Sequence, residues 1–407
     1  MLTADMWVPT FLRRRPSYVT FVPFLCTVLL WNLAFGGLKF LIKNLTVGHL
    51  SIGPGQLLEH VVAYLSIGCV VAYLVGGCLC HAVRKRLLVF LTAVTAIAAL
   101  LAEYKWGLAS ETSLTVTGIV IGFSFGIFSV ARTVISCYEI KRTGLHSTTV
   151  NGLVVVMVIA PTIVGAFVST RLFELVGVQT LWVFLGFFAM IGLISHWLRY
   201  GDVEELLPFR ESVRRVGSDF LFVLRNRSVI VFPSAALWAI SIIVGVKSIP
   251  YAAETYGIRE SMGSLVLLAT AVGAVAGNAA TLWTATRRRW TWFRLATYVF
   301  AVLIVLFPLL TRSFSDMVVY SLVLGFAMGM ATNLADSAYL RYIGDHDVKE
   351  NGAALSGLAL NVFIAMLLVA LHWLPVWVHF PVLGIFATVM GFYVLLRLKT
   401  LDGDIKE

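Results

Sequence analysis

The chain has 407 residues, of which 59% are hydrophobic and only 13% are charged, and its formal net charge is +10. Soluble globular domains have about a quarter of their residues charged, so this composition excludes that class. The apolar residues fall in blocks of about 18 to 25, the length at which a helix crosses a hydrocarbon core of ~30 Å. We therefore expect an all-α polytopic membrane protein, since helices are the economical way to span lipid at this length.

The sequence predicts about twelve transmembrane helices, six on each side of a long polar segment. We expect an N-terminal six-helix bundle at 1–198, a cytoplasmic linker at 199–228 and a C-terminal six-helix bundle at 229–407. The two bundles are expected to be pseudo-symmetric. The expected spans are 18–42, 58–80, 87–104, 113–138, 148–172, 179–198, 229–251, 261–284, 293–311, 316–341, 351–373 and 380–397.

Lysine and arginine are distributed unevenly over the expected loops. If both termini are cytoplasmic, about 23 of the 31 Lys and Arg residues fall on the cytoplasmic side. This is the positive-inside bias of membrane proteins, and it predicts the orientation of the chain. The positive charge thus reflects topology, and we expect no nucleic-acid partner.

The sequence carries no recognisable catalytic or metal-binding motif. Its five cysteines lie in or at the edges of the expected spans without C-x-x-C spacing, so we expect no disulfide framework and no metal site. It has no Gly-rich phosphate loop, H-E-x-x-H or G-x-S-x-G pattern. We therefore expect a protein that is not an enzyme and has no cofactor; a membrane-embedded acyltransferase is the alternative from a different class.

The first span of each half carries a lysine near its outer end. Gly37 to Lys39 reads GLK, and Gly245 to Lys247 reads GVK. Two interpretations stay open for Lys39 and Lys247: each snorkels to the headgroups, or each faces a cavity.

Asparagines also lie inside the expected spans, among them Asn32 and Asn361. They are candidates for neutral hydrogen bonds to a substrate. Intramembrane asparagine as often joins one helix to another, so both roles stay open.

Further short patterns repeat in the same order in the two halves. The stretch IGFSFG from Ile121 is matched by LGFAMG from Leu324, and the Asn-Gly pair at 151–152 by another at 351–352. Parallel repeats of this kind are typical of transporters whose halves rock about a central site. We expect each half to supply one wall of a cavity.

The repeated spans each contain one deep charge. Arg132 lies in SVARTVIS, among small or hydroxylated residues, and Asp336 lies at similar depth in ATNLADSAY. An ionisable residue inside a membrane is costly and marks a functional site by default. Arg132 either snorkels to the headgroups or faces a wet cavity, whereas an aspartate has too little reach to snorkel. We hypothesise that the two face one cavity and form a charge pair on its cytoplasmic side; the alternative is a structural ion pair between two spans.

If the lysines also face the cavity, three positive charges meet one negative charge there. Such a surplus favours a small anionic or zwitterionic substrate with a phosphate or carboxylate group. The candidate substrate-binding residues are Arg132, Asp336, Lys39, Lys247, Asn32 and Asn361.

The polar linker has its own pattern. Its apolar residues recur at roughly helical spacing beside a pair of arginines, which is typical of a helix lying on the cytoplasmic membrane surface. A solvated linker with some helical content is the alternative. The residues concerned are Phe209, Val213, Val216, Phe220 and Val223, with Arg214 and Arg215.

The stretch GCLCHAVRKR, from Gly77 to Arg86, resembles the G-x-x-x-D-x-x-G-R-K/R motif that joins the second and third spans of the major facilitator superfamily. Gly77, Lys85 and Arg86 match the motif, and His81 stands where the family has the acid of its gating pair. The resemblance implies the major facilitator fold, with Gly77, His81, Lys85 and Arg86 as gating residues.

Within that superfamily the chain most resembles the bacterial lysophospholipid transporters. The family's first-span acid falls at Trp31 in this chain, and its seventh-span basic residue falls near Gly245. The stretches that carry the resemblance are FSVAR ending at Arg132, NGL from Asn151, GNAATLWTATRRR from Gly277 and AMLL from Ala365.

This resemblance implies a transporter that works by alternating access and flips lysophospholipid from the outer to the inner leaflet for reacylation. The expected setting is a bacterial inner membrane, with membrane lipids and a cytoplasmic acyltransferase as partners and the chain as a monomer. An exporter or importer of another small anionic metabolite or drug is the alternative function.

Overall fold

The structure is a computed structural model that describes residues 18–46, 54–106, 110–198, 206–258, 260–284, 289–345 and 348–401. The described residues form twelve α-helices and one short 3-10 helix, which confirms the all-α prediction. The elements are α1 (Tyr18–Thr46), α2 (Pro54–Ala82), α3 (Lys85–Trp106), α4 (Glu111–Thr143), α5 (Ser147–Val176), η3 (Gly177–Gln179), α6 (Thr180–Ser195), α7 (Phe209–Tyr256), α8 (Glu260–Thr284), α9 (Arg289–Leu310), α10 (Phe314–Asp345), α11 (Lys349–His372) and α12 (Val376–Leu401).

Most helices follow the expected spans to within about five residues at each end. Ten described stretches are long and apolar enough to cross a membrane. One of them, Ser147–Ser195, contains both α5 and α6, and the apolar part of α12, Trp377–Tyr393, is a shorter additional helix. The chain is thus a multi-pass membrane protein, with twelve α-helices among its described residues.

The exception is α7, which begins at Phe209 and continues without a break to Tyr256. Its first half therefore occupies most of the segment expected as a linker, and the described part of its apolar span is Ser234–Tyr256. Residues 199–205 of that segment, and residues 285–288 of the loop after α8, lie outside the described residues. The domain boundaries at 198/199 and 228/229 remain predictions.

The ends of α4 illustrate how local sequence sets helix length. Ser110 caps the first turn by accepting a hydrogen bond from the Ser113 amide at 3.1 Å. At the other end Gly144 adopts a left-handed φ of 64°, a conformation that glycine allows without strain. Lys141 and Arg142 in the last turn complement the negative end of the helix dipole.

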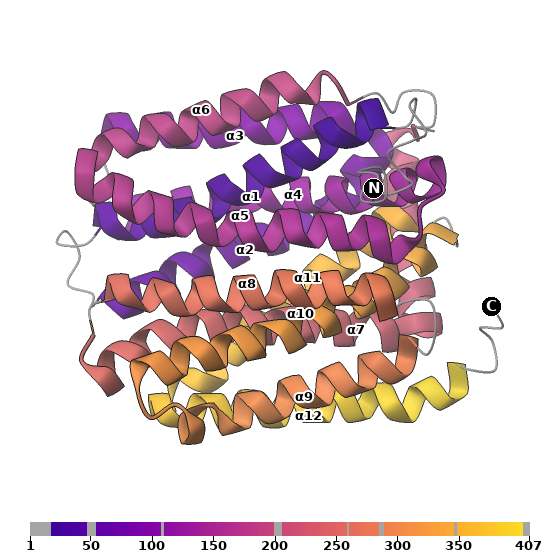
Figure 1. Ribbon diagram of the computed structural model, residues 1–407. Helices are drawn as coiled ribbons and strands as arrows, with labels where there is room; N and C mark the ends of the chain where they lie inside the picture. Colours follow the sequence, from indigo (N-terminus) through magenta and orange to yellow (C-terminus); the bar gives the residue numbers. More distant parts are fainter. Residues whose placement is uncertain are drawn as a thin grey trace, which may run out of the picture.

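The twelve helices form two six-helix bundles, α1–α6 and α7–α12, that lie side by side (Figure 1). Between the bundles, α2 packs against α11 and α5 packs against α8. Each bundle has its own apolar core. The two cores also meet, because Ala353 of α11 packs in the core of α1–α6 and Ile159 of α5 packs in the core of α7–α12. The central cavity, and the polar contacts that join the bundles at one end of it, lie along this interface and are described below.

The glycines of the repeated stretches IGFSFG and LGFAMG pack helices within each bundle and do not line the cavity. A Cβ atom on Gly122 of α4 would lie 2.0 Å from the Leu65 carbonyl oxygen of α2, and one on Gly325 of α10 would lie 2.0 Å from the Thr270 carbonyl oxygen of α8. Small residues at such positions let helix backbones approach closely. Residues that follow these glycines, such as Arg132 in α4 and Asp336 in α10, are among those that line the cavity.

Candidate functional site

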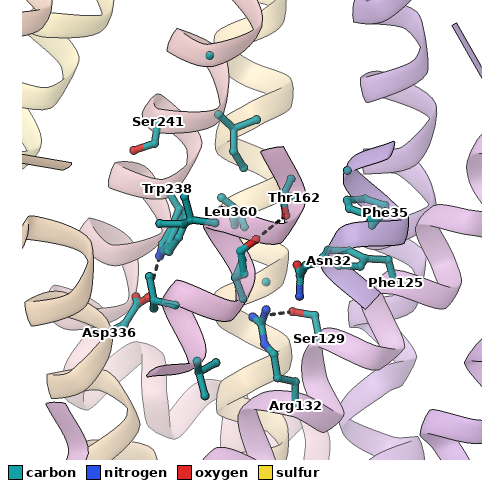
Figure 2. A pocket seen from close by; sticks show the side chains of 18 of the residues that line it. Asn32, Phe35, Phe125, Ser129, Arg132, Thr162, Trp238, Ser241, Asp336 and Leu360 are labelled. Atoms are coloured by element: carbon teal, nitrogen blue, oxygen red, sulfur yellow. Dashed lines mark hydrogen bonds between the residues drawn. The ribbon is translucent and has the colours of Figure 1, made fainter. Parts of the chain in front are cut away.

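A cavity of about 350 Å³ lies between the bundles. Its described lining comes from α1, α2, α4 and α5 on one side and from α7, α8, α10 and α11 on the other. Most lining side chains are aliphatic or aromatic, such as Phe35, Phe125 and Leu360 (Figure 2). The few charged groups therefore stand out against an apolar background.

Arg132 is the charged group of α4 on the N-terminal wall. Its guanidinium points into the cavity and donates a hydrogen bond to Ser129 Oγ at 3.3 Å (Figure 2). Thr133 and Ser136 on the same helix use their hydroxyls to donate to the backbone oxygens of Ser129 and Arg132, at 3.0 and 2.9 Å. A guanidinium has five donors in a fork that fits phosphate and carboxylate, so this wall suits an anionic group.

Asp336 of α10 is the charged group of the C-terminal wall. Its carboxylate accepts a hydrogen bond from Trp238 Nε1 at 2.7 Å and a second from the Ser234 hydroxyl. Ser234 and Trp238 lie four residues apart on α7, so they present their donors on one helix face. These two bonds offset part of the cost of burying a carboxylate.

Arg132 and Asp336 both line the cavity, but the contact pair that we expected between them is not made. The Asp336 carboxylate is held by α7, and the Arg132 guanidinium bonds within α4 (Figure 2). Each charge already has its own neutral partners, so the two face one another across the cavity as separate groups.

Lys39 and Asn32 of α1 also line the cavity. The Lys39 ammonium lies 4.4 Å from the centroid of the Phe35 ring, a favourable cation–π distance. The Asn32 amide donates to the Val28 carbonyl oxygen at 2.7 Å, which leaves its side-chain oxygen on the cavity side as an acceptor.

Lys247 and Asn361 are buried, each 4% exposed, but they do not line the cavity. Asn361 uses its amide to bond the Gly357 carbonyl oxygen one turn earlier in α11, at 2.9 Å. The sequence match between Lys39 and Lys247 thus does not extend to the helix face they occupy. Four of the six candidate binding residues come together on the cavity.

The bundles are joined by polar contacts at the end of the molecule where α2 passes into α3, which we call the α2–α3 end. A Cβ atom on Gly77 would lie 2.2 Å from Asn351 Oδ1 of α11, so glycine is needed for this close approach. The Asn351 side-chain nitrogen lies 3.2 Å from His81 Nε2 and donates to Asp219 Oδ2 at 2.7 Å. Arg215 lies 3.5 Å from the same carboxylate.

Asp219 was not predicted from the sequence. His81 occupies the place of the motif's acid, and the carboxylate at this end comes instead from the first half of α7. The i, i+4 spacing of Arg215 and Asp219 was the available signal, since it is typical of a paired helical face.

A buried ion pair lies beside this contact. Lys85 Nζ of α3 lies 3.8 Å from Glu350 Oε1 of α11, and their side chains are 1% and 5% exposed. Lys349 lies 3.9 Å from the same oxygen. Of the four expected gating residues, Gly77, His81 and Lys85 therefore face the opposite bundle, whereas Arg86 is exposed.

The first Asn-Gly pair, at 151–152, makes an equivalent link across the bundles. Asn151 of α5 donates to Asn333 Oδ1 of α10 at 2.8 Å, and Asn333 in turn donates to Thr281 of α8. Both repeated asparagines thus bind a helix of the other bundle. The cavity lining extends away from these contacts, toward the opposite end, through Lys39 and Ile249.

Comparison with known proteins agrees with this architecture. Residues 20–370 match the family model described as Major Facilitator Superfamily. The crystal structure of the human organic anion transporter MFSD10 (TETRAN) superposes with a TM-score of 0.71 at 15% identity, covering 94% of this chain and 100% of that one. The E. coli fucose:proton symporter FucP superposes with a TM-score of 0.70 at 9% identity, covering 94% and 99%. No curated protein matches in sequence, and at these identities the two structures show the fold alone.

Proposed function

The chain belongs to the major facilitator superfamily, and from that premise we propose that this secondary transporter moves a lysophospholipid, a phosphate-bearing amphiphile, across the membrane by alternating access. The family and the fold make it a multi-pass membrane transporter and not an enzyme. The substrate class rests on the chemistry of the cavity.

The observation that carries the proposal is a cationic group in a largely apolar cavity between the bundles. Arg132 offers a planar fork of donors to a phosphate, and Lys39 offers a second positive charge nearer the opposite end. The apolar lining gains free energy by burying hydrocarbon, at about 25 cal/mol per Å². Together these features suit a molecule with one anionic head and one apolar chain.

The hydroxyl groups on the cavity argue against a sugar-like substrate. Thr162 donates to the Val158 carbonyl oxygen at 2.6 Å, and Ser241 donates to the Leu237 carbonyl oxygen at 2.6 Å. Their protons are therefore already used within their own helices. A polyol would find few free donors here apart from the cationic groups.

The proposed direction and setting rest on the resemblance to the bacterial lysophospholipid transporters and on the positive-inside bias. With both termini in the cytoplasm of a bacterial inner membrane, the α2–α3 end is the cytoplasmic end and the cavity extends toward the outer leaflet. The transporter would then take lysophospholipid from the outer leaflet and deliver it, as a monomer, to a cytoplasmic acyltransferase.

A small organic anion is the second candidate, and the size of the cavity favours it. A volume of about 350 Å³ is at the lower end of the ~300–1,000 Å³ of ligand pockets. A compact anion fits within it, whereas a lysophospholipid must leave part of its acyl chain outside. MFSD10, which shares the fold, is itself an organic anion transporter.

Reconstitution into liposomes distinguishes these substrates. The assay follows a fluorescent lysophosphatidylethanolamine between leaflets by its exposure to a membrane-impermeant quencher. We expect movement in the native protein, loss in Arg132→Ala, and retention in the matched control Arg171→Ala, because Arg171 is an exposed residue paired with Glu174. Uptake of a small organic anion without movement of the lipid would favour the second candidate. Movement of neither would refute the substrate class.

A further inference from the structure

The first half of α7 has an exposed apolar face outside the membrane-spanning part of the helix. The sequence places the start of the α7 span near residue 229, and residues 209–225, which we call the surface helix, precede it. At 100° per residue these positions divide into three adjoining faces: one buried, one apolar and one basic.

The buried face fixes the surface helix to the rest of the protein. Ser212, Asp219 and Val223 are buried on this face. Asp219 accepts the bond from Asn351, and the Leu207 amide just before the helix donates to the His81 carbonyl oxygen at 3.0 Å. The helix is therefore held in one rotation, and its other faces point in defined directions.

The second face is apolar and exposed. Phe209 is 61% exposed and Val213 53%, and Leu224, which is 36% exposed, lies on the same side. Leu221, although exposed, lies between Arg210 and Arg214 on the basic side. Exposed apolar side chains within the spans meet lipid, but these lie before the span. In water such a face would lose the free energy of burying its apolar surface.

The third face is basic. Arg210, Arg214 and Arg225 are exposed next to the apolar face, with Glu211 as the acidic residue among them. Arg225 is four positions before residue 229, where the expected span starts, or about 6 Å at 1.5 Å per residue. The arginines are thus tied by a short length of helix to the boundary of the membrane.

We propose that the surface helix binds an anionic lipid surface, with Phe209, Val213 and Leu224 inserted among the acyl chains and Arg210, Arg214 and Arg225 on the headgroups. Three considerations support it: the order of the faces, the continuity of the helix with a span, and the charge complementarity between arginines and anionic lipid. Arginine stems also cover apolar surface while the charged head stays in water, which suits this boundary.

The test is a depth measurement on the full-length protein in vesicles with and without phosphatidylglycerol. A nitroxide label is placed by Val213→Cys on the apolar face and, as matched control, by Ser218→Cys on the polar face, after Cys26→Ser removes the exposed native thiol. We expect the label at 213 to collide several-fold more with oxygen than with a water-soluble nickel complex, and the label at 218 to show the reverse.

A second pair, Leu224→Cys on the apolar face against Glu211→Cys, repeats the measurement at positions that are also exposed. The triple variant Arg210→Gln, Arg214→Gln, Arg225→Gln is expected to lose the added immersion that phosphatidylglycerol gives. Nickel access at both faces would overturn the proposal in favour of a solvated linker. A label at 213 shielded from both reagents would overturn it in favour of a protein partner. Neither result depends on which substrate is transported.

Discussion

Replacing Gly357 by alanine is expected to favour opening of the α2–α3 end. In the structure the ring of Tyr73, on α2, packs directly against Gly357 of α11 at the inner part of the cavity. A Cβ atom on Gly357 would lie 2.1 Å from Tyr73 Cε1 and 2.3 Å from its Cζ. Non-bonded carbon atoms normally lie about 3.5–4.0 Å apart. In the closed arrangement the new Cβ atom would therefore lie more than an ångström too close to the Tyr73 ring.

The size of the effect follows from the cost of this overlap. Forcing an additional methyl group into a packed site typically costs about 1–3 kcal/mol. If α2 and α11 separate when this end opens, only the closed conformation carries that cost. The ratio of open to closed protein then rises by about 5- to 150-fold, since each 1.4 kcal/mol is a factor of ten.

The assay is the labelling rate of Ser136→Cys by an impermeant maleimide added on the α2–α3 side. Ser136 lines the cavity and is 1% exposed, so its labelling reports access from that side. The control is Gly186→Ala, because a Cβ atom there meets nothing within 4 Å. An unchanged rate in folded Gly357→Ala protein, equal to that of the control, would refute the idea that these two helices separate.

Three further substitutions test the site and the packing. Asp336→Asn is expected to fold, because the asparagine amide keeps one acceptor oxygen. It is expected to bind an anionic lysophospholipid up to about tenfold more tightly, because the negative charge that repels the substrate is removed. An unfolded protein would indicate a structural role for Asp336. Lys85→Gln is expected to lower the thermal melting temperature, because breaking a buried ion pair costs about 3–5 kcal/mol. Adding Glu350→Gln to it should restore most of the lost stability. Equal melting temperatures of Lys85→Gln and the native protein would show that the pair contributes nothing. Gly329→Leu is expected to abolish the monodisperse peak in size-exclusion chromatography, because its Cβ atom would lie 2.2 Å from the Ala274 carbonyl oxygen; a folded protein would contradict the packing of α8 on α10.

The helices were predictable because lipid allows few alternatives. An apolar run of about twenty residues has to form a helix in hydrocarbon, so the lengths of the runs gave the spans. The first half of α7 was not predictable to the same degree. In a polar segment helical spacing competes with solvation, and the tertiary contacts at Ser212 and Asp219 that hold the helix are not visible in the local sequence.

The cavity residues show the same division. Arg132, Asp336, Lys39 and Asn32 were found because a polar group inside a span needs a polar or aqueous neighbour. Their partners were not found, because Trp238 reaches Asp336 from another helix, 98 positions away in the sequence. Lys247 was placed by its match to Lys39, but a repeated motif fixes neither the rotation of a helix nor its neighbours.

The position of Asp219 also bears on how the two halves depend on each other. This carboxylate lies on the stretch of chain between the bundles, yet it binds Asn351 in the eleventh helix. The connecting stretch therefore contributes a tertiary contact to the second half and does more than join the two bundles. Hybrid proteins assembled from halves of different relatives would keep this contact only if the crossover falls before Asp219, so that Asp219 and Asn351 come from the same relative.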